Sequence, residues 1–383
     1  MSDISFSKRF VIPGLLGFLQ ATFLWAILTY ITIYWIDIGF SHLQVGLLIS
    51  VFPLVSLMLM IPFGIFVDRI SPKKLVVASQ LIFGLSILGL LNAHDFWSTM
   101  LMLGIGGTGN ALFSNALSAL FYKTLGDKIR GLKLGFFTAG ILVGYGLGSL
   151  LGGYLLSAFD MNAIFLFSLA GTLPMVILSL LLPDIPGTRV KIADYRADIS
   201  NRSALIFIIL VFAFSLHAGA EQSSFSLFLN KEIKLDKESV GWIFFIHANV
   251  MALLSIVSGF YADRVNSRGK GLAWLYYTGI AISGVTNILL IFTYNFGTVL
   301  AMRLTHAVGD SLTLVIRSLI VSNMFIATRM GGNLATIQVT ITLGTLFGSI
   351  ISGAVPGYAS GFVIAGAAAV IAVTFALFAK PKF

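Results

Sequence analysis

One stretch of this sequence occurs twice, and each copy is long and apolar enough to cross a lipid bilayer. Residues 45–74 read VGLLISVFPLVSLMLMIPFGIFVDRISPKK, and residues 240–270 read VGWIFFIHANVMALLSIVSGFYADRVNSRGK. An ungapped alignment superimposes the residues that close each apolar run, namely Gly64 and Gly259, Asp68 and Asp263, and Arg69 and Arg264. A repeat of about half the chain length predicts a duplicated helical architecture.

The composition places the chain in a membrane. Of its 383 residues 57% are hydrophobic and only 10% are charged, with a mean hydropathy of +0.97, whereas soluble domains carry about 25% charged residues. The apolar runs are long enough for transmembrane helices of about 20 residues. There is no cysteine, which excludes disulfides and thiolate metal ligands. No GxxxxGK[ST] motif is present, so we expect neither ATP-driven transport nor a bound cofactor.

The net charge of +9 does not indicate nucleic-acid binding, because the positive charges follow the membrane topology. With the N-terminus inside, the inner segments hold most of the lysines and arginines, and the outer loops hold only Lys231, Lys234 and Lys237. This positive-inside bias predicts a multi-pass protein of the plasma (inner) membrane with both termini in the cytoplasm.

The hydrophobic runs predict an all-α protein with twelve transmembrane helices in two six-helix bundles. The first six are expected near 10–36, 43–66, 74–92, 98–122, 132–158 and 161–182, and the last six near 204–229, 238–262, 270–293, 296–322, 332–355 and 357–379. The corresponding domains are an N-terminal bundle over 1–182, a cytoplasmic connector over 183–203 and a C-terminal bundle over 204–383. Pro183, Pro186 and Gly187 end the sixth helix and open the connector.

Together these features resemble the major facilitator superfamily. The sequence Gly64-x-x-x-Asp68-Arg69, followed by Lys73 and Lys74, is similar to the loop motif that this family carries between its second and third helices, although Ser71–Pro72 stands where the family usually has glycine and a basic residue. The resemblance implies two halves that rock about a central cavity, and a monomer. It also implies a conformational latch formed by Gly64, Asp68, Arg69, Asp263 and Arg264.

The glycine-rich fifth helix leaves the subfamily open. Gly144, Gly148 and Gly153 reappear in the eleventh helix as Gly344, Gly348 and Gly353, a spacing that favours close helix packing. The run is similar to the glycine motif of the family's drug antiporters. That motif has a Gly-Pro step, however, and here Tyr145 follows Gly144.

Ionisable residues inside the second half form the strongest candidate site. In the helix over 296–322, residues Arg303, His306, Asp310 and Arg317 fall on one face at 100° per residue. His217 and Glu221 share a face of the helix over 204–229. Each such charge costs roughly 2.5–3.5 kcal/mol at the bilayer centre, so we expect these groups to face water or partners. The resemblance implies that the first, fourth, seventh and tenth helices line the cavity.

The matching helices of the first half carry neutral and aromatic side chains. Thr22, Trp25 and Thr29 lie on the first helix, and Asn115 and Tyr122 lie on the fourth. We predict that these residues and Tyr145 contact the substrate, together with Arg303 and Arg317, which would attract an anionic group. Asp310, Glu221, His306 and His217 are predicted to couple transport to protons, since carboxylates and histidines change charge at accessible pH.

The leading hypothesis is a secondary transporter, not an enzyme, that moves a small organic solute with protons. The aromatic first half favours efflux of amphipathic compounds, whereas Arg303 and Arg317 suit uptake or export of an organic anion. The i, i+4 pairs His217–Glu221 and His306–Asp310 leave a divalent-metal transporter as an alternative. A membrane enzyme is disfavoured because no nucleophile is recognisably paired with these groups. Substrate identity, direction, and symport, antiport or uniport stay open.

Overall fold

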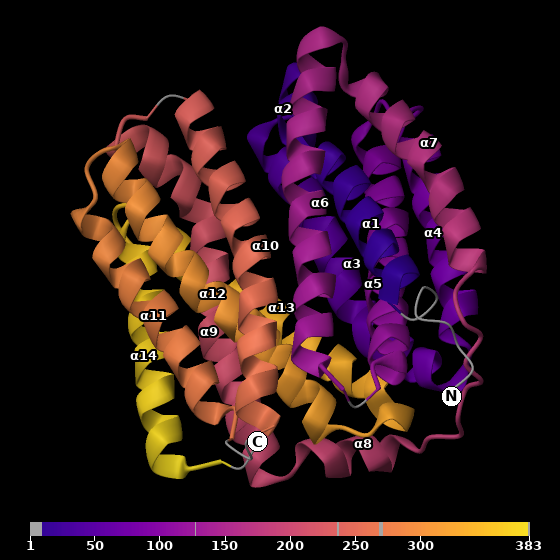
Figure 1. Ribbon diagram of the computed structural model, residues 1–383. Helices are drawn as coiled ribbons and strands as arrows, with labels where there is room; N and C mark the ends of the chain where they lie inside the picture. The colour runs from indigo at the N-terminus through magenta and orange to yellow at the C-terminus, as the bar shows by residue number, and fades with distance from the viewer. Residues whose placement is uncertain (1–9, 127, 236, 268–270, 382–383) are drawn as a thin grey trace. The chain divides into compact units, whose positions relative to one another are not determined.

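The computed structural model describes residues 10–126, 128–235, 237–267 and 271–381, and across these ranges the regular structure is helical, with no strand (Figure 1). The helices of the first half are α1 (Ile12–Leu28), α2 (Ile31–Asp37), α3 (His42–Arg69), α4 (Pro72–Leu90), α5 (Phe96–Thr124), α6 (Arg130–Ala158) and α7 (Met161–Leu180). Those that follow are α8 (Ile192–Ile199), α9 (Arg202–Leu227), α10 (Lys237–Ser267), α11 (Ala273–Leu289), α12 (Phe296–Met324), α13 (Met330–Ala354) and α14 (Ser360–Ala379). The prediction of an all-α polytopic membrane protein is confirmed.

Most of these helices can cross a bilayer by themselves. Among the described residues, 10 helices are long and apolar enough to span. The first expected helix is divided into α1 and the short α2, with the hydroxyl of Tyr30 at the break donating to the carbonyl oxygen of Ser149 at 2.8 Å. Helix α5 has 29 residues, and Asn110, Asn115 and Lys123 interrupt its apolar run.

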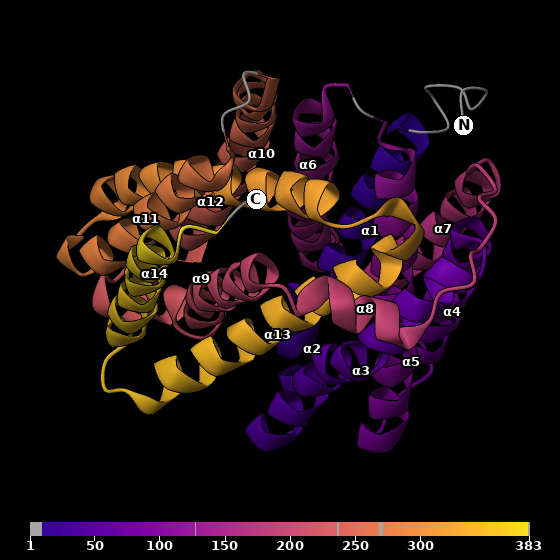
Figure 2. The ribbon, with the colours of Figure 1, turned by 90° about the horizontal axis from the view of Figure 1, so that it is seen from below.

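The chain forms two compact units, each with its own core. Unit 1 comprises 1–126, 140–191 and 327–336, and unit 2 comprises 127–139, 192–326 and 337–383. In unit 1, α5 packs against α3 and α4, and α7 packs against α1 and α4. In unit 2, α12 packs against α10 and α11, while α14 packs against α9 and α11. The close pairing of α11 with α12 is visible in both views (Figure 1, Figure 2).

Polar side chains define where several helices begin. Asp95 caps α5 by accepting hydrogen bonds from the backbone N–H groups of Trp97 and Ser98, at 2.9 and 3.1 Å. The Ser98 hydroxyl also donates to its carboxylate, and these bonds hold the pKa of Asp95 below its ordinary value. Asn295 and Thr298 form a reciprocal capping box at the start of α12. The first turn of α12 is thereby fixed, and with it the register of the polar face that follows.

Two of the repeated glycines allow helices to approach closely, one in each unit. A Cβ at Gly148 of α6 would collide with the backbone oxygen of Thr22 in α1, and a Cβ at Gly348 of α13 would collide with the oxygen of Leu216 in α9. Because no side chain fits at either contact, glycine is required there. The close packing expected from the glycine spacing is therefore present at these two crossings.

The segment before α8 is extended and lies along the end of α3. The backbone N–H of Thr188 donates to the carbonyl oxygen of Asp68 at 2.7 Å, and Arg69 donates to the carbonyl of Val190 at 3.0 Å. The Thr188 hydroxyl lies 3.1 Å from the carbonyl oxygen of Thr328, to which it can donate. Helix α8 then runs crosswise to α9 (Figure 1). The connector predicted as a polar link thus also contacts the residues of the repeated loop motif.

Candidate functional site

The polar face of α12 is buried within unit 2. Arg303, His306, Asp310 and Thr313 are exposed by 3%, 1%, 7% and 0%, and they lie on one side of the helix, as the spacing of the first three predicted. Thr313 donates to the carbonyl oxygen of Gly309 in its own helix. The three ionisable members face α9, α10 and α11 instead, and each finds polar partners on those helices.

Arg303 forms the strongest ion pair of this face. Its guanidinium contacts both carboxylate oxygens of Glu221 on α9, with Nη1–Oε1 and Nη2–Oε2 distances of 2.5 and 3.0 Å. The same guanidinium lies over the ring of Phe225, 4.6 Å from its centroid. Bidentate geometry makes this a charge-assisted pair of fixed orientation, and the neighbouring ring shields it.

His306 lies at the centre of the group. Its Nε2 is 3.1 Å from Glu221 Oε1 and 3.2 Å from Asp310 Oδ2, although it makes a directed hydrogen bond to neither oxygen. Its Nδ1 faces two hydroxyls of α11, at 2.9 Å from Thr286 Oγ1 and 3.4 Å from Ser283 Oγ. Ser283 in turn donates to Asp310 Oδ1 at 2.8 Å. One imidazole thus joins two carboxylates and two hydroxyls.

Two further histidines flank this centre. The i, i+4 spacing suggested that His217 would pair with Glu221; instead its Nε2 lies 3.6 Å from Asp310 Oδ2. His247 of α10 lies with its ring stacked on that of His306, the centroids 6.0 Å apart, and its Nδ1 is 3.0 Å from the carbonyl oxygen of Arg303. His217, His247, His306, Glu221, Asp310 and Arg303 are hereafter called the ionic cluster.

Charge balance divides the ionic cluster into two parts. Arg303 cannot release its proton in a protein, so the Arg303–Glu221 pair is neutral as a whole. Asp310 has no permanently charged partner among the described contacts, only His217, His306 and the Ser283 hydroxyl. An uncompensated buried charge is costly. The negative charge of Asp310 is therefore neutralised only when a proton resides on its carboxylate or on a neighbouring histidine. This part of the cluster is suited to gaining and losing one proton.

The same atoms have the spacing of a metal site. One ligand atom each from His217, His306 and Asp310 lies within 4.8 Å of the others, and two imidazoles with a carboxylate suit zinc or related cations. The carboxylate nearest to serve as a fourth ligand is Glu221, and Arg303 already holds both of its oxygens. The guanidinium would also repel a dication. The arrangement therefore fits a proton better than a metal ion.

The residues predicted to contact substrate in the first half lie in unit 1 and bond mostly to their own helices. Thr22 donates to the Phe18 carbonyl, Thr29 to the Trp25 carbonyl and Asn115 to the Ala111 carbonyl. Thr29 also contacts Ser149 across to α6, at 2.9 Å between hydroxyls. Trp25 and Tyr145 form an edge-to-face pair with centroids 4.5 Å apart. Tyr122 is buried.

Arg317, the other arginine predicted to bind substrate, is half-buried in unit 2. It lies on α12 two turns beyond Asp310. Its predicted role stays a prediction.

The first copy of the repeated motif ends in a buried carboxylate. Asp68 accepts hydrogen bonds from the backbone N–H groups of Gly331 and Gly332, both at 2.9 Å, at the start of α13. Lys123 of α5 pairs with the same carboxylate at 2.8 Å. Gly64, one turn earlier, permits the approach, since a Cβ there would lie 2.7 Å from the carbonyl oxygen of Gly331. An anion at a helix N-terminus is favourable electrostatically.

The second copy repeats the carboxylate contact at the start of a different helix. Asp263 accepts from the N–H groups of Gly131 and Leu132 at the start of α6, at 2.8 and 2.9 Å. Arg264 is exposed and lies over the ring of Phe260, 4.5 Å from its centroid. The two predicted latch sites thus share the carboxylate cap of a helix.

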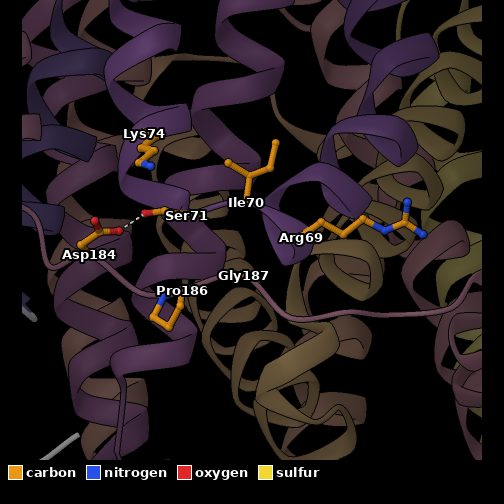
Figure 3. A pocket seen from close by; sticks show the side chains of 7 residues that line it. All are labelled: Arg69, Ile70, Ser71, Lys74, Asp184, Pro186 and Gly187. Carbon is orange, nitrogen blue, oxygen red and sulfur yellow. Dashed lines mark hydrogen bonds between the residues drawn. The ribbon is translucent and has the colours of Figure 1, made fainter.

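An open surface pocket of about 530 Å³ lies beside the first motif (Figure 3). It is lined by residues of the α3–α4 turn and of the connector, namely Arg69, Ile70, Ser71, Lys74, Asp184, Pro186 and Gly187. Ser71 donates to Asp184 across it. Cations and a carboxylate share its walls, so its charge favours no single class of ligand.

Several residues that contact the buried carboxylates could not be identified from the sequence. Ser283 and Thr286 are ordinary hydroxyls in an apolar helix, and nothing in their spacing indicates that they face His306 and Asp310. In the sequence, Lys123 is simply one of the basic residues expected on the inner side. A buried charge at a helix end could have indicated a partner, but the sequence does not show that α5 packs against α3.

The family model described as Major Facilitator Superfamily matches residues 14–268 and 205–383. Among curated proteins, the chain is 24% identical over 339 residues to the uncharacterized MFS-type transporter MJ1560 of Methanocaldococcus jannaschii, covering 84% of each chain. It is 22% identical over 331 residues to the quinolone resistance protein NorA of Staphylococcus aureus, covering 84% of this chain and 83% of that one.

Among solved structures, the human organic anion transporter MFSD10 (TETRAN) matches with a TM-score of 0.80 at 14% identity, over 97% of this chain and 99% of that one. At this identity the likeness concerns the fold alone.

Proposed function

The chain belongs to the major facilitator superfamily, and from that premise we propose that it is a proton-coupled secondary transporter of small organic solutes. The single observation that supports proton coupling is the buried set of Asp310, His217 and His306, in which the ion pairs of the described residues bring no permanent charge to the carboxylate. Transport follows from the family and the membrane-spanning helices; the coupling ion and the substrate are the proposal.

Asp310 is the better proton carrier of the two buried carboxylates. Glu221 is already matched in both charge and geometry by Arg303. Asp310 contacts groups that can themselves exchange protons, and it is 7% exposed. We assign Asp310 as the principal proton carrier, with His306 and His217 as its exchange partners. The Glu221–Arg303 ion pair keeps its charges throughout.

For the substrate, we propose amphipathic organic compounds moved by efflux. The aromatic pair Trp25–Tyr145 offers apolar contact, and the relative NorA is named for quinolone resistance. The alternative, an organic anion, would need a free guanidinium, whereas Arg303 is engaged by Glu221. Protonation of Glu221 or occupation of Arg317 would then be required, so the anion stays the second candidate.

The remaining assignments follow from the family and the charge bias. We propose a monomer with both termini in the cytoplasm of the plasma (inner) membrane, and N- and C-terminal bundles over 1–182 and 204–383 joined by the connector. Asp68 and Asp263 would hold the starts of α13 and α6 in one conformation and release them in the other.

Reconstitution into proteoliposomes tests the coupling. An imposed pH gradient should drive uptake of a fluorescent amphipathic cation by the wild type. Asp310→Asn should lose gradient-driven flux by an order of magnitude or more, since an amide cannot exchange the proton, while solute exchange at equal pH persists. Asp37→Asn, at an exposed position, is the matched control.

Full gradient-driven flux in Asp310→Asn would contradict the assignment of Asp310. Flux of an organic anion but of no cation would favour the second candidate. Tight Zn²⁺ binding that is lost in His217→Ala would instead favour the metal alternative.

A further inference from the structure

The hydroxyls and carbonyls around the ionic cluster determine which ring nitrogen of each histidine carries a proton. A hydroxyl has one proton to donate. Thr286 lies within hydrogen-bond distance of the carbonyl oxygens of Ile282 and Ser283 in its own helix, at 2.8 and 3.0 Å, and donates its proton to them. Toward His306 its oxygen can therefore only accept, so Nδ1 of His306 must be an N–H donor.

The neighbouring serine is consistent with this assignment. Ser283 donates its own proton to Asp310 Oδ1, so its oxygen also faces His306 Nδ1 as an acceptor, at 3.4 Å. Both hydroxyls of α11 thus present lone pairs to the same ring nitrogen. The second nitrogen, Nε2, is left facing the carboxylates of Glu221 and Asp310.

The flanking histidines have the same tautomer for a simpler reason. Nδ1 of His217 contacts the carbonyl oxygen of Phe214, and Nδ1 of His247 contacts that of Arg303. A carbonyl oxygen accepts and never donates, so both Nδ1 atoms carry protons. In each buried histidine of the cluster, the nitrogen left free to exchange is therefore Nε2.

From this geometry we infer that the transported proton is exchanged between Asp310 Oδ2 and His306 Nε2, and that Ser283 and Thr286 are positioning residues that reserve Nε2 for it. The inference rests on the proposed proton coupling. In the step, the O–H bond of Asp310 breaks and the Nε2–H bond of His306 forms, giving an imidazolium beside a carboxylate. The proton enters from water and leaves to water, and no other bond changes.

The position of the proton between Asp310 and His306 depends on every charged or hydroxyl group that faces His306. Among the described residues they are Glu221 and His217 from α9, His247 from α10, Ser283 and Thr286 from α11, and Arg303 and Asp310 from α12. The two α11 hydroxyls act mainly with opposite sign, because Ser283 lies 2.8 Å from Asp310 Oδ1 but 3.4 Å from His306 Nδ1, whereas Thr286 lies 2.9 Å from His306 Nδ1. Ser283 stabilises the anionic carboxylate by donating to it, whereas Thr286 stabilises the cationic imidazolium by accepting from it.

Removing the two hydroxyls should therefore shift the pH dependence of flux in opposite directions, a result that a merely structural role would not give. Ser283→Ala should move the pH midpoint of gradient-driven flux upward by about one unit, and Thr286→Val should move it downward by about one unit, because charge-assisted hydrogen bonds are the stronger ones. Thr286→Ser keeps the acceptor and should restore the midpoint. Thr278→Val, which removes an exposed hydroxyl of the same helix that donates to Trp274, should leave it unchanged.

A second measurement does not depend on transport. The chain has five histidines, so ¹⁵N-histidine-labelled protein in nanodiscs gives few signals, and the His306→Gln spectrum identifies that of His306. Above its titration we expect a protonated Nδ1 and a bare Nε2, with both protonated below it. A neutral His306 with the proton on Nε2, or midpoints that move in the same direction in Ser283→Ala and Thr286→Val, would overturn the inference.

Proton coupling and the tautomer of His306 can be tested independently. If the tautomer is as expected but a pH gradient drives no flux, proton coupling is wrong and the exchange step has no role in transport. If flux is coupled but His306 has the other tautomer, coupling stands and the assignment of atoms falls.

Discussion

At the scale of single residues, burial and charge decide which polar groups act together. Asp68 is fully buried, and its two oxygens are satisfied by the α13 backbone and by Lys123. Asp263 caps α6 with the same geometry but is half-buried. Removing a hydrogen-bond partner should therefore cost more free energy of unfolding at Asp68 than at Asp263.

Lys123→Met should destabilise the protein by about 3–5 kcal/mol, the cost typical of leaving one partner of a buried ion pair alone. Adding Asp68→Asn should recover part of this loss, since the unpaired charge is then gone. Thermal unfolding in detergent, analysed as a double-mutant cycle, measures the coupling. Additive effects of the two changes would show that the pair contributes nothing specific.

At the scale of helices, backbone approach matters more than side-chain type. Gly259 of α10 lies against the carbonyl oxygen of Gly131 in α6, with no room for a Cβ. Gly241 of the same helix has nothing within 4 Å of a built Cβ. Substituting each glycine therefore distinguishes two effects on stability. At Gly259 an added Cβ would disturb the helix contact, whereas at Gly241 it would change only the helix propensity.

Gly259→Ala should cost about 1–3 kcal/mol, as overpacking does, and it should weaken the cap at Asp263, one turn away. Gly241→Ala should be neutral or slightly stabilising, because alanine favours the helix. Melting temperatures of the purified variants compare the two directly. Equal melting temperatures for Gly259→Ala and the wild type would mean that the α10–α6 contact is not maintained in solution.

At the scale of the whole molecule, the proposed orientation rests on the distribution of basic residues. The chain has no cysteine, so single cysteines report sidedness without background. Arg189, before α8, and Lys231, after α9, are both exposed. They lie at opposite ends of one predicted transmembrane passage.

A membrane-impermeant maleimide applied to intact cells should label Lys231→Cys and not Arg189→Cys, and inverted vesicles should give the reverse. The physical reason is that basic segments are retained on the inner side during insertion. Labelling of Arg189→Cys from outside would place the termini on the other face and would contradict the proposed orientation.

The helices, the repeated motif and the polar face of α12 could be predicted from the sequence, because each depends on local periodicity or on short spacing. Hydropathy located most spans, and the steps between Arg303, His306 and Asp310 placed them on one side of their helix. The resemblance in the repeated loops indicated the family that the comparison then showed. These properties are encoded within one or two helical turns.

The partners of the buried polar groups, in contrast, follow only from how the helices pack. Local spacing paired His217 with Glu221, whereas helix packing brings Glu221 to Arg303 and His217 to Asp310. It also brings Lys123 to Asp68, and Ser283 and Thr286 to the ionic cluster. The physical reason is that the rotation and depth of one helix against another depend on close packing along their whole lengths, which no short pattern specifies.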